Sequence, residues 1–171
     1  MTRPYNRDTI QAHLGHSLRR KVPQSTKYAI VGSRDWPENQ SETVIAYIKS
    51  LPMKSVVVSG GARGVDTLAE EQALQSGLAV QIYKADWDKY GKSAGMRRNK
   101  DIVDNADALV AFWCNQSKGT ANSISRALKR GIPVTVLMDN GLQFNPTKQS
   151  DLKEISSQAT VLPQKQIQLK L

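Results

Sequence analysis

The sequence predicts an α/β protein with a Rossmann-like, doubly wound sheet of about five parallel strands and helices on both faces. Two observations predict this fold. Short apolar segments alternate with segments of helical periodicity between residues 27 and 138, and such alternation implies parallel strands joined by right-handed crossovers. One of the short segments, residues 55–59 (SVVVS), is apolar without alternation, which is typical of a strand that is buried on both faces.

The first half of this region supplies two strands and two helices. Residues 27–32 (KYAIVG) form a short apolar strand, and residues 41–50 carry apolar side chains at helical spacing after an N-cap type serine. Residues 55–59 (SVVVS) are rich in β-branched side chains and form the second strand. Residues 66–76 follow with an apolar stripe, and Gly77 stands where a C′ glycine ends a helix.

The second half repeats the pattern. Residues 79–83 form the third strand, and after a long connection residues 93–105 place apolar side chains on one helical face. Residues 108–113 (ALVAFW) form the fourth strand. Residues 120–130 form the last helix, and Gly131 stands where a C′ glycine ends it. Residues 132–138 form the fifth strand.

The chain carries 24 basic and 15 acidic residues, a formal net charge of +9. Residues 1–26 contribute +4, residues 27–139 contribute +3 and residues 140–171 contribute +2, so most of the excess lies in the two ends. We therefore divide the chain into a basic N-terminal extension that is expected to be partly helical, a Rossmann-like nucleotide-binding domain, and a C-terminal extension that could form an interface. The basic ends are either solvated tails or a weak, salt-sensitive contact to nucleic acid.

The composition excludes several kinds of site. Cys114 is the only cysteine, which excludes an intrachain disulfide and a zinc site of the multi-cysteine kind. His13 and His16 are the only histidines, so we expect no metal site and no histidine-activated nucleophile in the domain. No apolar segment approaches the roughly 20 residues that span a bilayer, and the N-terminus has no apolar signal region. We expect a cytoplasmic protein without a membrane contact and without a cofactor.

Four predicted strands are followed by residues that suit an anionic ligand. A parallel sheet binds ligands beyond the carboxyl ends of its strands, and glycines that lead into a helix leave backbone N–H groups that favour an anion. The candidate nucleotide-binding residues, taken turn by turn, are Gly32, Ser33 and Arg34; Ser59, Gly60, Gly61, Ala62, Arg63 and Asp66; Trp87, Tyr90, Arg98 and Asn99; and Lys118, Gly119, Thr120 and Asn122.

These residue types divide the work of holding a nucleotide. Arginines would bind phosphate groups, the two glycine-containing turns would cradle them, and Trp87 or Tyr90 would stack on a base. Asp66 is either an N-cap or an acceptor for a ribose hydroxyl. Each turn alone also has a plain structural explanation, such as a tight turn, an N-cap or a surface ion pair. The coincidence of four such turns at one edge of one sheet indicates a nucleotide-shaped ligand.

The segments IVGSRDW, VVVSGGARGVDTLAE, ADWDKYGKSAGMRRNKDIV, ADALVAFW and SKGTANSI resemble the SLOG superfamily of Rossmann-like proteins, most closely its YspA/YpsA-like branch. That superfamily includes DNA-processing protein DprA and the Lonely-guy phosphoribohydrolases, and the resemblance covers about residues 27–138. The resemblance implies that SGGARGVD and GT are phosphate-binding turns. It also implies binding of a nucleotide or a nucleotide-derived signal, often in conflicts between phages and bacteria.

One departure from the superfamily bears on catalysis. Lonely-guy enzymes carry a catalytic glutamate at the position of Ser123, and an N-glycosidic hydrolase needs a carboxylate near the ribose. No residue visibly replaces it, although Asp35, Asp66, Asp86 or Asp88 could approach the site in three dimensions. We therefore assign no catalytic residue and favour binding over hydrolysis.

Three functions follow from the sequence. The main hypothesis is a sensor or sponge that binds a nucleotide derivative, such as a derivative of ADP-ribose, without turnover. The alternatives are a phosphoribohydrolase-like enzyme and a DprA-like module that binds single-stranded DNA. Apolar positions within both extensions, at residues 5–20 and 158–171, favour a homodimer or a higher homo-oligomer.

Overall fold

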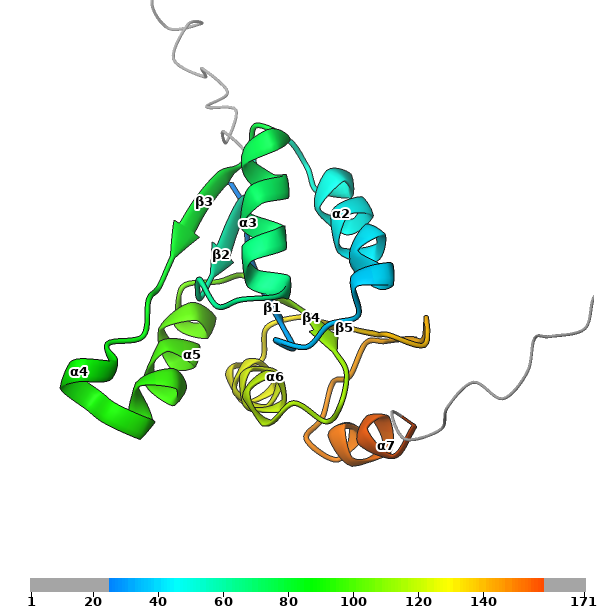
Figure 1. The fold of residues 1–171 in the computed structure, drawn as a ribbon. Coiled ribbons are helices and arrows are strands. Elements are labelled where there is room, and N and C mark those ends of the chain that lie inside the picture. Colours follow the sequence, from blue (N-terminus) through cyan, green and yellow to red (C-terminus); the bar gives the residue numbers. More distant parts are fainter. Residues whose placement is uncertain (1–24, 159–171) are drawn as a thin grey trace, which may run out of the picture.

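The computed structural model describes residues 25–158 (Figure 1). Its strands are β1 (Lys27–Gly32), β2 (Val56–Ser59), β3 (Ala79–Ile82), β4 (Ala108–Trp113), β5 (Val134–Met138) and β6 (Gln143–Phe144). Its α-helices are α2 (Ser41–Ser50), α3 (Val65–Gln75), α4 (Trp87–Tyr90), α5 (Ala94–Asp104), α6 (Lys118–Arg130) and α7 (Asp151–Gln158). Two short 3-10 helices, η1 (Glu38–Gln40) and η2 (Gly91–Ser93), precede α2 and α5.

The strands form one sheet in the order β3-β2-β1-β4-β5-β6. β1 to β5 are parallel, and β6 pairs antiparallel with β5. The chain passes from β1 outward to β3 and then returns to β4 on the other side of β1, so the strand order reverses between β1 and β4. The predicted doubly wound α/β fold is confirmed, with a sixth, two-residue strand added at one edge.

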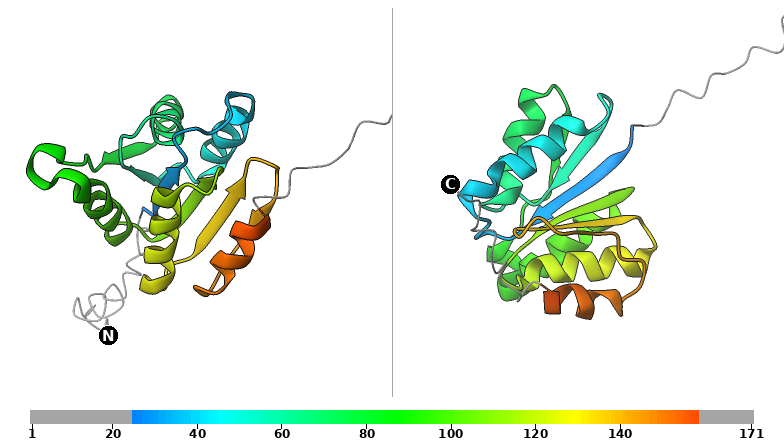
Figure 2. Two further views of the ribbon diagram at one scale, coloured as in Figure 1. Left: turned by 60° about the horizontal axis from the view of Figure 1, so that its bottom comes forward. Right: turned by 90° about the vertical axis from the view of Figure 1, so that its right-hand side faces the viewer.

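Each face of the sheet is covered by helices (Figure 2). Ile30, Val57 and Phe112 point to the face that α2 and α3 cover. Val31 and Ala111, their neighbours in the chain, point to the other face and pack against α5, α6 and α7. Because side chains alternate across a strand, burial on both faces requires the uninterrupted apolar segments seen in the sequence.

The segment after β5 adds to this core. β6 extends the sheet, and Ile155 of α7 is buried against the face that also contacts α5 and α6. Residues 140–158 of the proposed C-terminal extension therefore pack on the domain in this structure. The N-terminal expectation for residues 1–24 and the interface element expected near residues 159–171 lie outside the described residues.

The connection between β3 and α5 projects from the body of the protein (Figure 1). The sequence predicted a long connection here, and the structure places the short helix α4 and the 3-10 helix η2 within it. Within residues 25–158 no helix is long and apolar enough to cross a bilayer.

Candidate functional site

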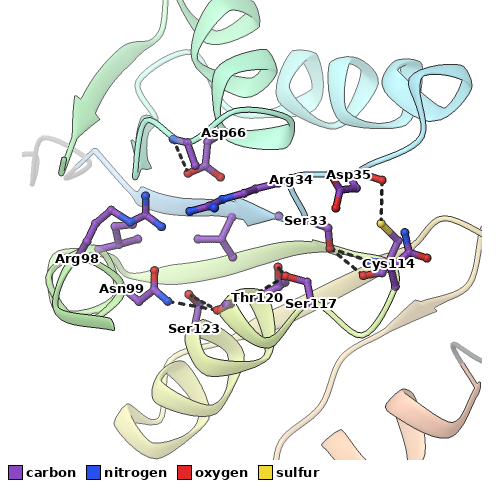
Figure 3. A pocket seen from close by; sticks show the side chains of 16 residues that line it. Ser33, Arg34, Asp35, Asp66, Arg98, Asn99, Cys114, Ser117, Thr120 and Ser123 are labelled. Carbon is purple, nitrogen blue, oxygen red and sulfur yellow. Dashed lines mark hydrogen bonds between the residues drawn. The ribbon is translucent and has the colours of Figure 1, made fainter. Parts of the chain in front are cut away.

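A cavity of about 380 Å³ opens at the carboxyl ends of β1 and β4, where the strand order reverses. The turns after these two strands form one wall, and residues of α3, α5 and α6 form the others (Figure 3). This is the place at which a doubly wound sheet is expected to bind a ligand. Its volume suits a group of about the size of one nucleotide.

Two guanidinium groups enter this cavity from different elements. Arg34 lies in the turn after β1, and Arg98 reaches in from the first half of α5 (Figure 3). Burial, followed by the positive charge of Arg34, lowers the pKa of Arg98, and the negative charge of Asp66 opposes this shift. Within residues 25–158 neither arginine forms an ion pair with a carboxylate. Two cations that face one cavity without a bound carboxylate favour an anionic ligand.

The guanidinium of Arg98 is held by the glycine-rich turn after β2. Its Nη1 donates a hydrogen bond to the carbonyl oxygen of Gly60 at 3.3 Å. Its Nε is buried and has no hydrogen-bond partner among the described residues. A buried, unpaired donor on a charged group is costly in free energy, so a ligand that accepts from this guanidinium would be stabilised.

The glycine-rich turn after β2 uses its backbone N–H groups internally. The N–H groups of Gly60 and Ala62 donate to Asp66 Oδ2 at 3.2 and 3.3 Å. The N–H of Gly61 donates to Glu70 Oε1 at 3.1 Å. Carboxylates of α3 thus occupy the N–H groups of Gly60, Gly61 and Ala62, to which a phosphate would otherwise bind.

Asp66 itself lies at the cavity wall, and only 5% of its surface is exposed. Burial raises the pKa of Asp66 to about 6, although its hydrogen bonds with backbone N–H groups and the charge of Arg98 act to lower it. The carboxylate thus changes its charge near neutral pH, in contact with the same space that the arginines face.

The turn after β4 is arranged differently. Ser117 is the N-cap of α6, and its Oγ accepts hydrogen bonds from the N–H and hydroxyl of Thr120 at 3.4 and 3.1 Å. Within the described part of the chain, the N–H groups of Lys118 and Gly119 donate to no protein acceptor. This helix end therefore adds a partial positive charge and free donors beside the cavity.

Ser33 has a structural position at the floor of the site. Its hydroxyl donates to the carbonyl oxygen of Cys114 and accepts from the N–H of Cys114, both at 3.0 Å. These two bonds join the ends of β1 and β4 and set the spacing of the two turns. The hydroxyl that the sequence analysis offered to a ligand is thus shared with the backbone of β4.

The cavity brings together about half of the residues that the sequence analysis proposed. Those that line it are Gly32, Ser33, Arg34, Ala62, Asp66, Arg98, Asn99, Gly119 and Thr120. Those that do not line it are Ser59, Gly60, Gly61, Arg63, Trp87, Tyr90, Lys118 and Asn122. Arg63 instead forms an exposed ion pair with Asp35 at 3.2 Å.

Seven lining residues were not proposed from the sequence: Val31, Asp35, Ile102, Cys114, Asn115, Ser117 and Ser123. Ser117 carried a usable signal, because a serine three residues before Thr120 is a typical N-cap. Asn115 lies in the left-handed region with φ of 50°, a strained conformation that tends to occur at functional sites. Ser123 donates to the carbonyl oxygen of Gly119 at 3.4 Å. Burial raises the pKa of the Cys114 thiol, which does not favour a nucleophilic role.

Trp87 and Tyr90 lie on the projecting connection, outside the cavity. Trp87 is half exposed, and its ring packs over Gly95, where an added Cβ would lie 3.3 Å from the indole. The ring of Tyr90 lies 4.4 Å from the guanidinium of Arg97 and 5.0 Å from Nζ of Lys89. This segment combines aromatic faces with cations, and α5 connects it to the cavity.

The described residues, 25–158, contain no group of three or more side chains of the His, Cys, Asp and Glu types that could hold a metal ion. The cavity itself offers two guanidinium groups, one buried carboxyl group, amide and hydroxyl groups, and the N-terminus of α6.

Comparisons with known proteins relate this chain to DNA-processing proteins. Residues 19–83 match the family described as DNA recombination-mediator protein A. The chain is 38% identical over 113 residues to the Gene 61 protein of Mycobacterium phage D29, an alignment that covers 61% of this chain and 90% of that protein. It is 35% identical over 85 residues to DNA processing protein DprA of Streptococcus pneumoniae strain R6, which covers 49% of this chain and 29% of that protein.

Two solved structures share the fold. The X-ray structure of DprA from Streptococcus pneumoniae matches with a TM-score of 0.60 and 22% identity, over 80% of this chain and 57% of that chain. A structure of DprA from Helicobacter pylori, which was described for its single-stranded DNA binding mode, matches with a TM-score of 0.56 and 22% identity, over 79% of this chain and 74% of that chain. This chain thus spans little more than half of the pneumococcal structure.

Proposed function

We propose that this chain, which belongs to the same family as the Gene 61 protein of Mycobacterium phage D29, binds single-stranded DNA. One phosphate of the strand would be held in the cavity between β1 and β4. The observation that carries this proposal is the pair of guanidinium groups, Arg34 and Arg98, which face the same cavity without a carboxylate partner among residues 25–158. A phosphate between them would relieve their mutual repulsion and accept hydrogen bonds from both.

The distribution of charge in the domain supports a polyanionic ligand. Residues 84–100 contain six basic and two acidic residues, a net charge of +4. The rest of residues 25–158 contains eleven basic and twelve acidic residues, a net charge of −1. The positive charge therefore lies on the projecting connection and the start of α5, which adjoin the cavity through Arg98. A strand held at the cavity would pass over this surface.

The aromatic residues of the same connection support a single strand rather than a duplex. Unpaired bases stack on exposed aromatic side chains, and such stacking tolerates any sequence. Trp87 is half exposed, and the edge of its indole at Cη2 and Cζ2 lies beside Gly95. Tyr90 is already flanked by Lys89 and Arg97, so Trp87 is the better candidate for stacking on a base.

The relatives support DNA more than a free nucleotide. The matched family is named for recombination mediation, and one related structure was described for its single-stranded DNA binding mode. The initial hypothesis of a nucleotide sensor or sponge has no counterpart among these relatives. Binding of single-stranded DNA, the third function derived from the sequence, is the one that they favour.

The test is fluorescence anisotropy of a labelled 20-nucleotide oligodeoxynucleotide with the full chain and three variants. Arg34→Ala and Arg98→Ala should each weaken binding about tenfold or more, because each removes a charge-assisted hydrogen bond to phosphate. Lys129→Ala is the matched control, since it removes the same charge from the far end of α6, roughly 15 Å away. Equal affinities for all four proteins would contradict the proposal.

A nucleotide-derived small molecule remains a second candidate, and the recessed shape of the cavity favours it. A site of about 380 Å³ with a buried carboxyl group suits a compact ligand with both anionic and hydroxyl groups. Isothermal titration with ADP-ribose, NAD and cyclic dinucleotides tests this candidate. Mass spectrometry of the compounds released by heat denaturation of the purified protein would identify a ligand that co-purifies. A protein that binds the oligonucleotide but none of these compounds would exclude this candidate.

A further inference from the structure

The cavity between β1 and β4 is closed at its bottom by buried side chains. Val31 of β1, Ile102 of α5 and Ser123 of α6 line this part, and each is at most 5% exposed. Among residues 25–158, the exposed residues that line the cavity all lie in the turns after β1 and β4 or in the first turn of α6, and they are Arg34, Asp35, Asn115 and Gly119. A ligand therefore enters from the side on which these turns meet the solvent.

A cavity of this shape suits the end of a strand better than its middle. An internal nucleotide is joined to a neighbour on each side, so two segments of the strand would have to pass through the same opening. A terminal nucleotide has one neighbour, so the rest of the strand leaves by a single route. The volume of about 380 Å³ also suits one nucleotide and not a run of several.

Both carboxylates at the cavity wall already have hydrogen-bond partners. Asp66 Oδ2 accepts from the N–H groups of Gly60 and Ala62 at 3.2 and 3.3 Å. Asp35 forms the exposed ion pair with Arg63 at 3.2 Å. These contacts leave the two guanidinium groups of the cavity without an ion pair within residues 25–158, so they remain available to a ligand.

Arg34 and Arg98 together offer two positive charges to that ligand. Figure 3 shows the side chain of Arg34 extending across the cavity toward Arg98. The start of α6 adds a partial positive charge and the N–H groups of Lys118 and Gly119. An internal phosphodiester carries one negative charge, whereas a terminal phosphomonoester carries about −1.5 to −2 at neutral pH and has three acceptor oxygens. The monoester therefore matches the two guanidinium groups more closely.

We propose that the cavity binds the phosphorylated end of a DNA strand, with the terminal phosphomonoester between Arg34 and Arg98 and the strand leaving over the projecting connection of residues 84–100. This inference rests on the proposed function, because it specifies which phosphate of the single strand enters the cavity. A strand without a terminal phosphate can place the phosphodiester of its last nucleotide there, with less negative charge. The phosphate belongs to the 5′ or the 3′ end, and the experiment separates the two.

The experiment measures the anisotropy of three 20-nucleotide oligodeoxynucleotides of one sequence with the full chain. Each carries an internal fluorophore, and they have a 5′-phosphate, a 3′-phosphate or no terminal phosphate. Phosphorylation at the recognised end should raise the affinity about tenfold, as expected for additional charge-assisted hydrogen bonds. Phosphorylation at the other end should leave the affinity close to that of the unphosphorylated strand. Equal affinities for all three strands would overturn the inference, while the proposed function stands.

Arg34→Ala and Arg98→Ala test whether the cavity causes this preference. Each variant removes one of the two charges that face the phosphate, so the preference for the phosphorylated strand should fall from about tenfold to within about threefold. Lys129→Ala is the matched control, since it removes one positive charge from the last turn of α6 and should keep the preference of the wild type. An unchanged preference in both cavity variants would place the strand end elsewhere and overturn the inference.

A circular single strand of the same composition tests whether the cavity requires an end. It should bind through the basic connection without entering the cavity, so Arg34→Ala should change its affinity by less than about twofold. A circular strand that depends on Arg34 as strongly as the linear strand does would show that internal phosphates enter the cavity. That result would overturn the inference and leave the proposed function intact. If no strand binds to the wild-type protein, both fail.

Discussion

The turn after β2 and the turn after β4 both lead from a buried parallel strand into a helix, but their backbone N–H groups have different partners. In the first turn Asp66 and Glu70 of the following helix accept from Gly60, Gly61 and Ala62. In the second, Ser117 is the acceptor, with its hydroxyl for the N–H of Thr120 and its carbonyl oxygen for the N–H of Ala121. The N–H groups of Lys118 and Gly119 have no protein acceptor within residues 25–158.

This difference teaches that a glycine-rich sequence does not by itself provide an anion site. Glycines permit the turn to bring N–H groups together, yet a carboxylate in the first two turns of the next helix competes with any ligand for them. Asp66 and Glu70 stand at those positions after β2, whereas α6 has no acidic residue in its first turn. The turn after β2 therefore mainly stabilises the fold, whereas the turn after β4 leaves backbone N–H groups at the start of α6 available to a ligand.

The largest expected effect concerns the glycines of the two turns. Gly64 has φ of +85°, and a Cβ there would lie 2.7 Å from the carbonyl oxygen of Arg34. Gly64→Ala should therefore destabilise the fold by about 2 to 4 kcal/mol. Gly119→Ala meets no atom within 4 Å and lies in α6, so it should leave stability unchanged or raise it by about 0.5 to 1 kcal/mol. Urea unfolding of both variants measures the contrast, and equal losses would contradict it.

The next effect concerns the carboxylate that holds the first turn. Because burial raises the pKa of Asp66 to about 6, the folded state binds its proton more tightly than the unfolded state does. This contribution to stability is present below about pH 4 and is lost as the pH rises through about 6. From pH 5 to 7.5 the wild type should lose about 1 to 1.5 kcal/mol relative to Asp66→Asn.

The measurement is urea unfolding of the two proteins at both pH values. Glu71→Gln serves as the comparison, because Glu71 is exposed on the same helix and its charge does not shift the pKa of Asp66, so the pH dependence should follow that of the wild type. A wild type and an Asp66→Asn variant with the same pH dependence would show that Asp66 does not titrate in this range.

The N-cap of α6, in the turn after β4, should have a smaller effect on stability. Ser117 Oγ accepts the N–H of Thr120, and this bond stabilises the start of α6. Ser117→Ala should lower stability by about 1 kcal/mol, as the loss of an N-cap does elsewhere. Ser117→Asp keeps an acceptor and should restore the stability, while its negative charge beside the cavity should weaken DNA binding. Thermal unfolding and anisotropy on the same samples check both statements.

The smallest effect is expected at the exposed ion pair that joins the turn after β2 to the turn after β1. Arg63 and Asp35 lie 3.2 Å apart, and both side chains are about three-quarters exposed. Arg63→Ala should change stability by less than about 0.5 kcal/mol. Since Arg63 does not line the cavity, the affinity for a short oligonucleotide should fall by no more than about threefold. A loss as large as that of Arg98→Ala would move the anion site toward the first turn.

Much of the fold could be predicted because its pattern is local. The uninterrupted apolar segment 108–113 and the apolar stripes of the helices record burial residue by residue, and the strand–helix alternation then permits few topologies. β6 and α7 could not be predicted in this way. β6 is only two residues long, and α7 buries a single large side chain, Ile155, so neither leaves a periodic signal.

The candidate site could be predicted only in outline. The rule that ligands bind beyond the carboxyl ends of parallel strands places Arg34, Asp66 and Arg98 at one edge of the sheet, and the structure gathers them around one cavity. The rule did not indicate that Val31 and Ile102 line the same space, because the direction of a side chain at the end of a strand or on a helix depends on how the elements pack.

The sequence by itself determined the order of strands and helices and the edge of the sheet at which charge and glycine collect, because hydrophobic periodicity and turn chemistry are written in neighbouring residues. Only the tertiary structure decided which donors stay free. Hydrogen bonds such as that between Gly61 and Glu70 form when α3 packs back on the turn, and the two arginines meet only when the turn after β1 and the start of α5 are brought together. Both contacts depend on how separate elements pack, and they distinguish a turn that supports the fold from one that can bind a ligand.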